Sequence, residues 1–310
     1  MVPRYSLILL LAFFLIGCRP ASPTPTAVPV TSSPSGIEAT ATPQISTAAP
    51  DRSALIRDAK YQLGIPDSLQ IVQLQNGKFE QGTSGAEDYI SVAITNFVTA
   101  GDLDGDGVDE LAALISENYG GTGVFVFLAI YKDVSGTPTF LTSAIVDDRP
   151  QLTALSVDNG EVFLDATIHA MDEPMCCPTL RTSRHYRLIN EQLDMTDYTT
   201  FTPDGRPRTI TIESPASGTE IFSSVQVKGS VAIAPFENNL TYSLKDGAGV
   251  ELSRGAVPVT AADLGAPGTF DEQISIGNII SGTVVTIEIQ DISAADGSLL
   301  AMDSVELVVK

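Results

Sequence analysis

The chain has 310 residues, and its 38 acidic against 17 basic side chains give a formal net charge of −21 at pH 7. A negative charge of this size repels nucleic acid and anionic lipid headgroups, so we expect no nucleic-acid partner. The whole chain contains 2 histidines and 3 cysteines, which leaves few side chains for a catalytic base, a thiol nucleophile or a zinc site.

Residues 1–17 have the pattern of an export signal. Arg4 supplies a positive charge, an apolar run extends from Leu7 to Ile16, and a small residue precedes Cys18. The run is about half of the roughly 20 apolar residues that a transmembrane helix needs, so we predict a signal peptide. The motif resembles a bacterial lipobox, which implies palmitate-type acylation of Cys18 and an extracytoplasmic chain anchored by lipid to a membrane, at the cell surface or the periplasmic face. An ordinary cleaved signal or a short anchor is the alternative.

Residues 18–50 follow the lipobox and are dominated by Pro, Thr, Ser and Ala, with no aromatic residue. Such a segment cannot bury enough apolar surface to offset the entropy lost on ordering. We predict a disordered stalk that separates the folded part from the membrane. The length that remains suits two domains, for which we expect the boundaries 51–205 and 206–310.

The first folded segment begins with a helix pattern. Apolar residues recur at helical spacing from Ser53 to Leu63, Ser53 is placed to cap the start, and Gly64 and Pro66 end the pattern. Short strand patterns follow at 89–95, 111–116, 123–131, 152–157, 161–168 and 183–189. The Asp-Asn-Gly sequence at 158–160 is typical of a tight β-hairpin turn. We therefore expect a mainly β protein whose first domain is α+β, an antiparallel sheet with one short helix.

Residues 101–110 read Gly-Asp-Leu-Asp-Gly-Asp-Gly-Val-Asp-Glu and lie between two expected strands. Carboxylates at alternate positions can converge on one hard cation, and the glycines permit the tight turn that this convergence requires. Without a cation the carboxylates would repel one another. We predict a structural Ca²⁺ site, with these expected ligands: the side chains of Asp102, Asp104, Asp106 and Glu110, and the carbonyl of Val108.

The loop differs from an EF-hand, because Ala113 stands where an EF-hand has a bidentate glutamate and because strand patterns flank it. It resembles the calcium loops between strands in integrin-type blade repeats. Only one copy is present in the sequence, which argues against a propeller. The alternative to a calcium site is a solvated Asp-Gly turn.

Cys176 and Cys177 are adjacent and flanked by Pro174 and Pro178. Adjacent cysteines in an oxidising compartment can form a vicinal disulfide, and we expect one here. One alternative is a zinc site formed with His169 and His185, although neighbouring cysteines reach one tetrahedral ion awkwardly. Another is a redox-catalytic site, although the C-x-x-C spacing is absent. Together with the Asp-rich loop, this motif resembles the LppP/LprE type of actinobacterial lipoproteins over about residues 90–190. That resemblance implies an exported lipoprotein domain and no particular activity.

Residues 206–310 contain short strand patterns separated by Gly, Pro and Asn turns, at 209–213, 225–231, 240–245, 255–259, 270–274, 283–290 and 304–309. This regular spacing predicts a β-sandwich. The sequences at 212–218, 225–230, 267–270 and 293–298 resemble the immunoglobulin-like domain associated with bacterial spore germination. The resemblance implies an immunoglobulin-like accessory module for interaction or spacing, without a catalytic residue.

The sequence contains no G-x-S-x-G, H-E-x-x-H or phosphate-binding glycine motif. His169 and His185 are expected to be ordinary strand residues. We predict a non-enzymatic, membrane-anchored surface lipoprotein, stabilised by calcium, that presents an interaction module to a partner protein or an envelope component. The alternative is an exported hydrolase acting on the cell wall or an extracellular polymer, with its site in 51–205. A deep cavity that joins a histidine to carboxylates would favour that alternative.

Overall fold

The computed structural model describes residues 52–65 and 70–310. The predicted signal peptide at 1–17, the acylated Cys18 and the stalk at 18–50 lie outside these residues and stay predictions. Among the described residues, no helix is both long enough and apolar enough to cross a membrane.

The first helix is shorter than predicted. α1 spans Ser53–Ile56, with Arg52 rather than Ser53 at the N-cap position, and the chain continues as β1, Lys60–Gln62. Ala59, Tyr61 and Leu63 are buried, while the residues between them are at least partly exposed. This period of two is a strand pattern, and pairing with β2, Ile71–Gln73, selects the strand over further turns of helix.

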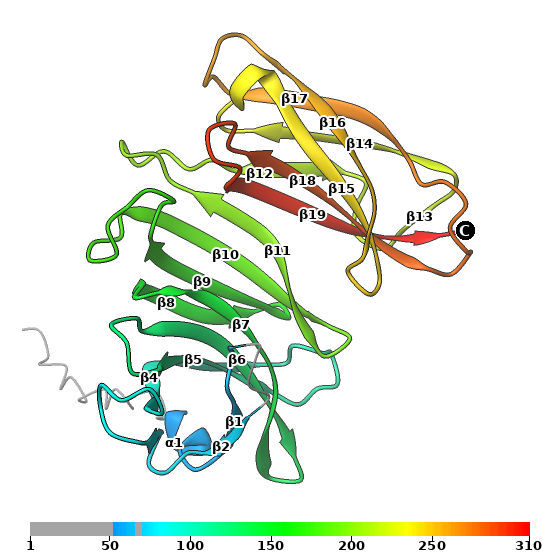
Figure 1. Cartoon of the computed structure of the whole chain (residues 1–310). Helices are drawn as coiled ribbons and strands as arrows, with labels where there is room; N and C mark the ends of the chain where they lie inside the picture. The colour runs from blue at the N-terminus through cyan, green and yellow to red at the C-terminus, as the bar shows by residue number, and fades with distance from the viewer. Residues whose placement is uncertain (1–51, 66–69) are drawn as a thin grey trace, which may run out of the picture. The chain divides into compact units, whose positions relative to one another are not determined.

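Five antiparallel strands form the next sheet, in the order β3-β4-β5-β6-β7 (Figure 1). Their bounds are β3 Lys78–Gln81, β4 Ile90–Gly101, β5 Glu110–Asn118, β6 Phe125–Val134 and β7 Thr137–Asp148. β5 and β6 are buried along nearly their whole length, because one face of the sheet packs on α1, β1 and β2 and the other on the following sheet. Strands covered on both faces are continuous apolar runs, as these two sequences are.

The following sheet begins as a meander of four antiparallel strands. These are β8 Gln151–Asp158, β9 Glu161–Ile168, β10 Leu180–Ile189 and β11 Gln192–Thr200. Asn159 and Gly160 connect β8 to β9 with φ angles of 51° and 78°. Two successive positive φ angles define the tight hairpin turn that the sequence predicts at this position.

The C-terminal residues form a β-sandwich. Its strands are β12 Ile210–Ser214, β13 Thr219–Ile221, β14 Ser224–Val231, β15 Asn239–Asp246, β16 Glu251–Ala261, β17 Gly268–Ser275, β18 Val284–Ile292 and β19 Leu299–Val309. One layer is β12-β14-β17 and the other is β15-β18-β19, with β16 pairing into both and β13 parallel to β19. A single hydrophobic cluster from these strands fills the interior. The mainly β fold class is confirmed.

The sandwich and the first domain share one sheet, because β11 pairs antiparallel with β19. The paired residues are Asp197 with Asp303, Tyr198 with Met302, and Thr199 with Ala301. Beyond the ladder, the Thr200 hydroxyl donates to the Leu300 carbonyl at 2.6 Å. The described residues belong to one compact unit, while the hydrophobic clusters fall on either side of the predicted boundary at 205/206.

Candidate metal site

The Asp-rich loop connects β4 to β5. Gly101, the last residue of β4, pairs with Glu110, the first residue of β5, so the loop closes on itself at the sheet edge. Gly105 and Gly107 have φ angles of 80° and 85°, and glycine is the residue that adopts this conformation without steric cost. The two glycines therefore allow the chain to turn tightly between the aspartates.

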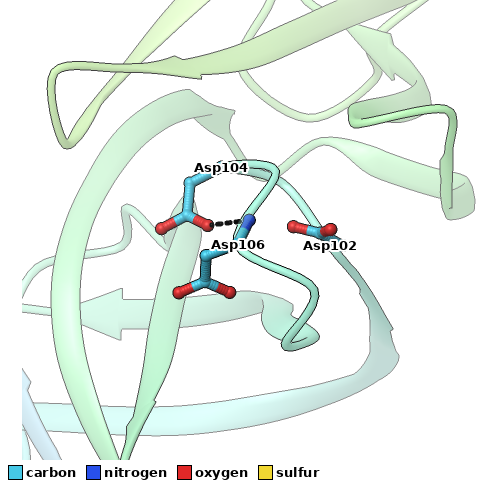
Figure 2. Close-up of side chains that lie close together, drawn as sticks. All are labelled: Asp102, Asp104 and Asp106. Atoms are coloured by element: carbon cyan, nitrogen blue, oxygen red, sulfur yellow. Dashed lines mark hydrogen bonds between the residues drawn. The ribbon is translucent and has the colours of Figure 1, made fainter.

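Three of the predicted ligands come together in this turn. Oxygen atoms from Asp102, Asp104 and Asp106 lie within 4.8 Å of one another (Figure 2). Backbone N–H groups of the loop fix these carboxylates: Asp102 accepts from Gly105 at 2.7 Å and from Gly107 at 3.0 Å. Asp104 accepts from the N–H of Asp106 at 3.1 Å. The turn thus orders three carboxylates around one point, as a hard cation requires.

Glu110 and Val108, the other predicted ligands, are not part of this group of three. Glu110 is fully buried, and its Oε2 accepts the N–H of Leu103 at 2.9 Å. Its Oε1 is buried and has no hydrogen-bond partner within 52–65 and 70–310, and burial raises the pKa of this carboxyl. The Val108 N–H donates to Asp106 Oδ1 at 2.9 Å. A buried carboxylate oxygen without a partner is costly unless a further group, such as a cation, satisfies it.

A lysine that the loop sequence does not contain also reaches the cluster. Lys132 on β6 has its Nζ 2.5 Å from Asp104 Oδ2 and 3.4 Å from Asp106 Oδ2. The hydrogen bond from Lys132 lowers the pKa of Asp104, and the same bond raises the pKa of Lys132. The sequence offers no local signal for this contact, because it depends on the β5–β6 register, in which Leu111 pairs with Tyr131.

The chemistry of these residues fits calcium. All side-chain donors are carboxylate oxygens, which calcium prefers, and the described part of the loop places no nitrogen or sulfur ligand among them. Glu110 adds a further carboxylate at the same loop, because its Oε2 accepts from the N–H of Leu103, which lies between Asp102 and Asp104. Its other oxygen, Oε1, has no hydrogen-bond partner among the described residues.

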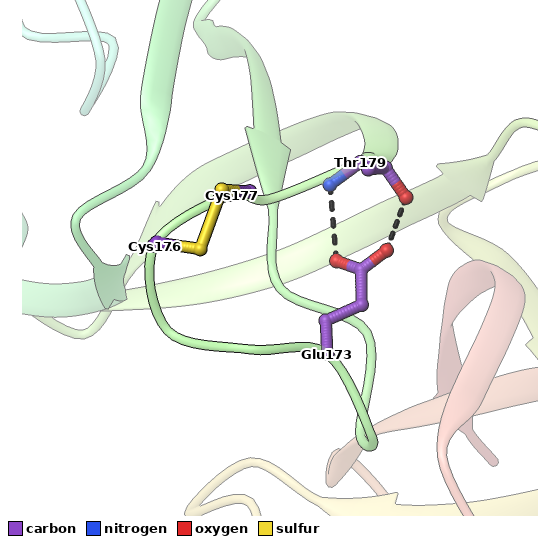
Figure 3. The surroundings of a disulfide bond; sticks show 4 residues. All are labelled: Glu173, Cys176, Cys177 and Thr179. Carbon is purple, nitrogen blue, oxygen red and sulfur yellow. Dashed lines mark hydrogen bonds between the residues drawn. A yellow bond between two sulfur atoms is a disulfide. The ribbon is translucent and has the colours of Figure 1, made fainter.

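The two cysteines form a second feature of the first domain. Cys176 and Cys177 are joined by a disulfide in the loop between β9 and β10 (Figure 3). Glu173 anchors this loop by accepting hydrogen bonds from the N–H groups of Ala170 and Thr179, each at 3.0 Å, and from the Thr179 hydroxyl. Both cysteines are exposed.

The two histidines lie apart from the metal loop and from each other. The side chain of His169 is 6 % exposed and its Nδ1 is 3.2 Å from Asp147 Oδ2. Its Nε2 is buried and has no hydrogen-bond partner in the described part of the chain. His185 packs on Phe163 with ring centroids 4.4 Å apart. Neither histidine lines the cavities of about 690 Å³ that the described residues form beside α1 and at the loops of the sandwich.

The loop end of the sandwich carries an open, mixed surface. Phe236 is 68 % and Leu264 is 73 % exposed, and both line the second of these cavities together with Arg206 and Arg208. Arg208 lies 3.9 Å from Asp291, a buried carboxyl whose pKa burial raises. Sequence reasoning did not identify this surface, because its residues come from separate loops.

Comparison with known families bears on the C-terminal residues. No curated protein matches the chain. Residues 209–298 match the model of the immunoglobulin-like domain of bacterial spore germination. The matched span contains β12 to β18, so it includes strands of both layers of the sandwich and ends just before β19. The resemblance that the sequence predicts for this segment is confirmed, and the C-terminal part of the chain is an immunoglobulin-like domain.

Proposed function

We propose that this chain is a non-enzymatic lipoprotein, held outside the cytoplasm by an acylated Cys18, that presents its immunoglobulin-like domain to a partner protein or an envelope component. The observation that carries the proposal is the pairing of β11 with β19. Domains joined only by a flexible linker move relative to each other. A shared sheet instead holds the interaction module in a fixed orientation on the first domain, which suits a scaffold for presentation.

The loop end of the module supports an interaction role. Exposed aromatic and arginine side chains are the residues that most often dominate the energy of protein contacts. Phe236, Arg206 and Arg208 gather at one cavity there. Leu264 adds to the apolar area of Phe236 at this cavity, so the surface offers both apolar area and charge to a partner.

Calcium is the second part of the proposal. Asp102, Asp104 and Asp106 would hold the ion, with Glu110 and the Val108 carbonyl as further ligands. Sites in exported proteins can be as weak as about 10⁻⁴ to 10⁻³ M, since external calcium still fills them. At 100 times its dissociation constant, the ion would add about 2.7 kcal/mol to the free energy of unfolding.

The surroundings of the two histidines support a non-enzymatic role. A general base must reach the proton that it abstracts. The Nε2 of His169 is buried and has no hydrogen-bond partner, so it does not contact a nucleophile among the described residues. His185 is engaged with an aromatic ring.

The anchoring is tested by labelling cells that express the full chain with radioactive palmitate, beside a Cys18→Ala variant. We expect label and membrane association in the parent and neither in the variant. An unlabelled parent, or a variant that carries as much label, would contradict the anchor.

The presentation role is tested with a photoreactive phenylalanine analogue at Phe236, in the anchored full chain. Phe222 is a matched control because it is 67 % exposed and does not line the cavity. We expect a discrete cross-linked product from position 236 and none from 222. The same products from both positions, or none from either, would remove the loop end as the presenting surface.

The calcium site is tested by thermal unfolding of the full chain in calcium and in chelator. We expect calcium to raise the melting temperature of the parent and to leave an Asp104→Ala variant unchanged. Asp172→Ala, in the exposed cysteine loop, is the charge-matched control and should respond like the parent. A parent that is indifferent to calcium and chelator would eliminate the site.

A further inference from the structure

The carboxylates that would bind calcium already hold a positive charge from the chain itself. The ammonium of Lys132 bridges Asp104 and Asp106, which are two of the three clustered aspartates. The lysine is fixed in this place by the backbone, because β5 and β6 pair along their length and bring residue 132 beside the start of β5. The side chain of Lys132 is 32 % exposed, so its stem borders on solvent.

The ammonium and a metal ion cannot occupy this position together. Calcium binds carboxylate oxygens at about 2.3 to 2.6 Å, and the lysine nitrogen is 2.5 Å from Asp104 Oδ2. A divalent ion on the same oxygen would meet both the volume and the charge of the ammonium. Lysine has a flexible four-carbon stem and a strongly hydrated head, so it can move into solvent when the ion takes its place.

We propose that Lys132 is an internal competitor for calcium, whose ammonium neutralises the loop when the ion is absent and must be displaced when the ion binds. The inference rests on the calcium site proposed above and adds its regulation. A separate observation is that Oε1 of Glu110, at the end of the same loop, is buried and has no hydrogen-bond partner among the described residues, so the lysine leaves this oxygen unsatisfied. Among the described residues the ammonium forms ion pairs with Asp104 and Asp106 alone, whereas a calcium ion takes six to eight oxygens.

This competition sets the range in which the site responds. Without the lysine, the repulsion between the aspartates would favour occupancy at low calcium. When the lysine is present, the net free energy of calcium binding is only the difference between the binding of the ion and the binding of the ammonium that it displaces. The site then fills and empties with the external calcium concentration.

The test measures calcium affinity calorimetrically on the full chain, with Lys132→Met as the variant, since methionine keeps an unbranched apolar stem and removes the charge. We expect the variant to bind calcium roughly tenfold more tightly than the parent. In chelator the variant should melt below the parent, so that calcium raises its melting temperature by more. Lys78→Met on β3 is the matched control for the change in net charge and should bind calcium like the parent.

A second measurement needs no variant at Lys132. Acylation of lysines in the parent, followed by mass spectrometry, reports how accessible each amine is. Calcium should speed the acylation of Lys132 and leave that of Lys78 unchanged. Equal affinities in parent and Lys132→Met, a Lys78→Met variant that gains as much, or a Lys132 amine that calcium does not expose would each overturn the competition and leave the calcium site standing. If neither parent nor Lys132→Met binds calcium, the site itself is wrong.

Discussion

Asp197 on β11 lies directly opposite Asp303 on β19, in the short ladder that joins the two domains. Like charges that face each other across an antiparallel pair repel. Asp303 keeps two hydrogen bonds, from the N–H of Ile212 at 2.6 Å and from the N–H of Ser304 at 2.8 Å. Burial, followed by the charges of Asp303 and Glu161, raises the pKa of Asp197 to about 7. Asp197 is therefore the carboxyl of this pair that gives up its charge near neutral pH.

The joint between the domains should weaken as the pH rises. An unfolded aspartate has a pKa of about 3.9, so between about pH 4 and 7 Asp197 holds a proton in the folded chain and none in the unfolded chain. The stability that this proton contributes is complete below about pH 4, falls progressively as the pH rises, and is fully lost above about pH 7. We expect the contribution of Asp197 to the free energy of unfolding to fall by about 2 kcal/mol between about pH 5.5 and 8.5, measured with urea.

Asp197→Asn isolates this contribution, because asparagine has the shape of the neutral acid. The variant should match the parent only below about pH 4, should be more stable at about pH 5.5, and should exceed the parent by about 2 kcal/mol more at about pH 8.5. The groups that face position 197 stay in place: Asp303 on β19, His185 on β10 and Glu161 on β9. Asp172→Asn, at an exposed position, should leave the pH profile unchanged. If Asp197→Asn keeps the parent's profile, the charge at the joint is not the cause.

The hydroxyl of Tyr61 should contribute more to the free energy of unfolding than that of an equally buried tyrosine without a hydrogen bond, because it donates to a buried carboxylate. Glu117 on β5 is 1 % exposed and accepts hydrogen bonds from the hydroxyls of Tyr61 and Tyr119, each at 2.5 Å, and from the N–H of Gly64 at 2.9 Å. Removing a donor from a buried charge costs about 2 kcal/mol, so we expect Tyr61→Phe to lose that much in urea unfolding. Tyr131 is equally buried, but its hydroxyl has no hydrogen-bond partner among the residues that the structure describes. Tyr131→Phe should be neutral or stabilising, and equal losses from both would argue against the carboxylate network.

The sequence predicts the fold where a local pattern and tertiary pairing agree. The turn at Asn159 and Gly160 is an example, since its residues favour the positive φ angles that β8 and β9 require. The region of β1 is the opposite case, because its apolar spacing is compatible with a helix until β2 pairs with it. The sequence pattern does not predict β7 or β11, for a related reason. Their polar and apolar residues do not alternate cleanly, and neighbouring strands decide their conformation.

The residues of the candidate metal site also differ in how far the sequence predicts them. Asp102, Asp104 and Asp106 could be predicted to converge because their spacing within one tight loop determines where the carboxylates lie. Lys132 could not, because the residue is distant in sequence and reaches the loop only through strand register. Glu110 was predicted as a ligand, but the structure bonds one of its oxygens to the Leu103 N–H and leaves the other unpartnered.

The disulfide should contribute little to global stability. A cross-link stabilises a fold mainly by closing a loop of the unfolded chain, and more so for longer loops. Cys176 and Cys177 are adjacent, so their disulfide closes almost no loop of the unfolded chain. We expect the double variant Cys176→Ser/Cys177→Ser to melt within about 2 °C of the parent by calorimetry.

The anchoring of the same loop should depend instead on Glu173, whose pKa is lowered chiefly by the hydrogen bond from the Thr179 hydroxyl. Glu173→Ala removes the acceptor of three hydrogen bonds. Limited proteolysis should cut this variant faster at 170–179 than it cuts the double serine variant. A double serine variant that unfolds far below the parent, or is cut as fast as Glu173→Ala, would show that the disulfide has a larger role.

Gly229 on β14 should be intolerant of any side chain. A methyl group at this position would overlap the carbonyl oxygen of Thr211 on β12 and the ring of Phe270 on β17. The carbonyl belongs to the backbone of the paired strand, so relief of the overlap requires β12 to move away from β14. We expect Gly229→Ala to lower the free energy of unfolding by about 2 to 3 kcal/mol.

Gly247 lies in the same sandwich and gives the matched control. A methyl group there would meet the Val284 carbonyl oxygen at 3.6 Å, which is an ordinary contact, so Gly247→Ala should stay within about 0.5 kcal/mol of the parent. Because the domains share the β11–β19 ladder, the effect of Gly229→Ala should also reach the joint. The variant should then show faster hydrogen exchange at the backbone amides of β19. If faster exchange is confined to β12 and β14, the layer that contains β19 is stable independently of the other layer. The effect of Gly229→Ala would then not reach the joint between the domains.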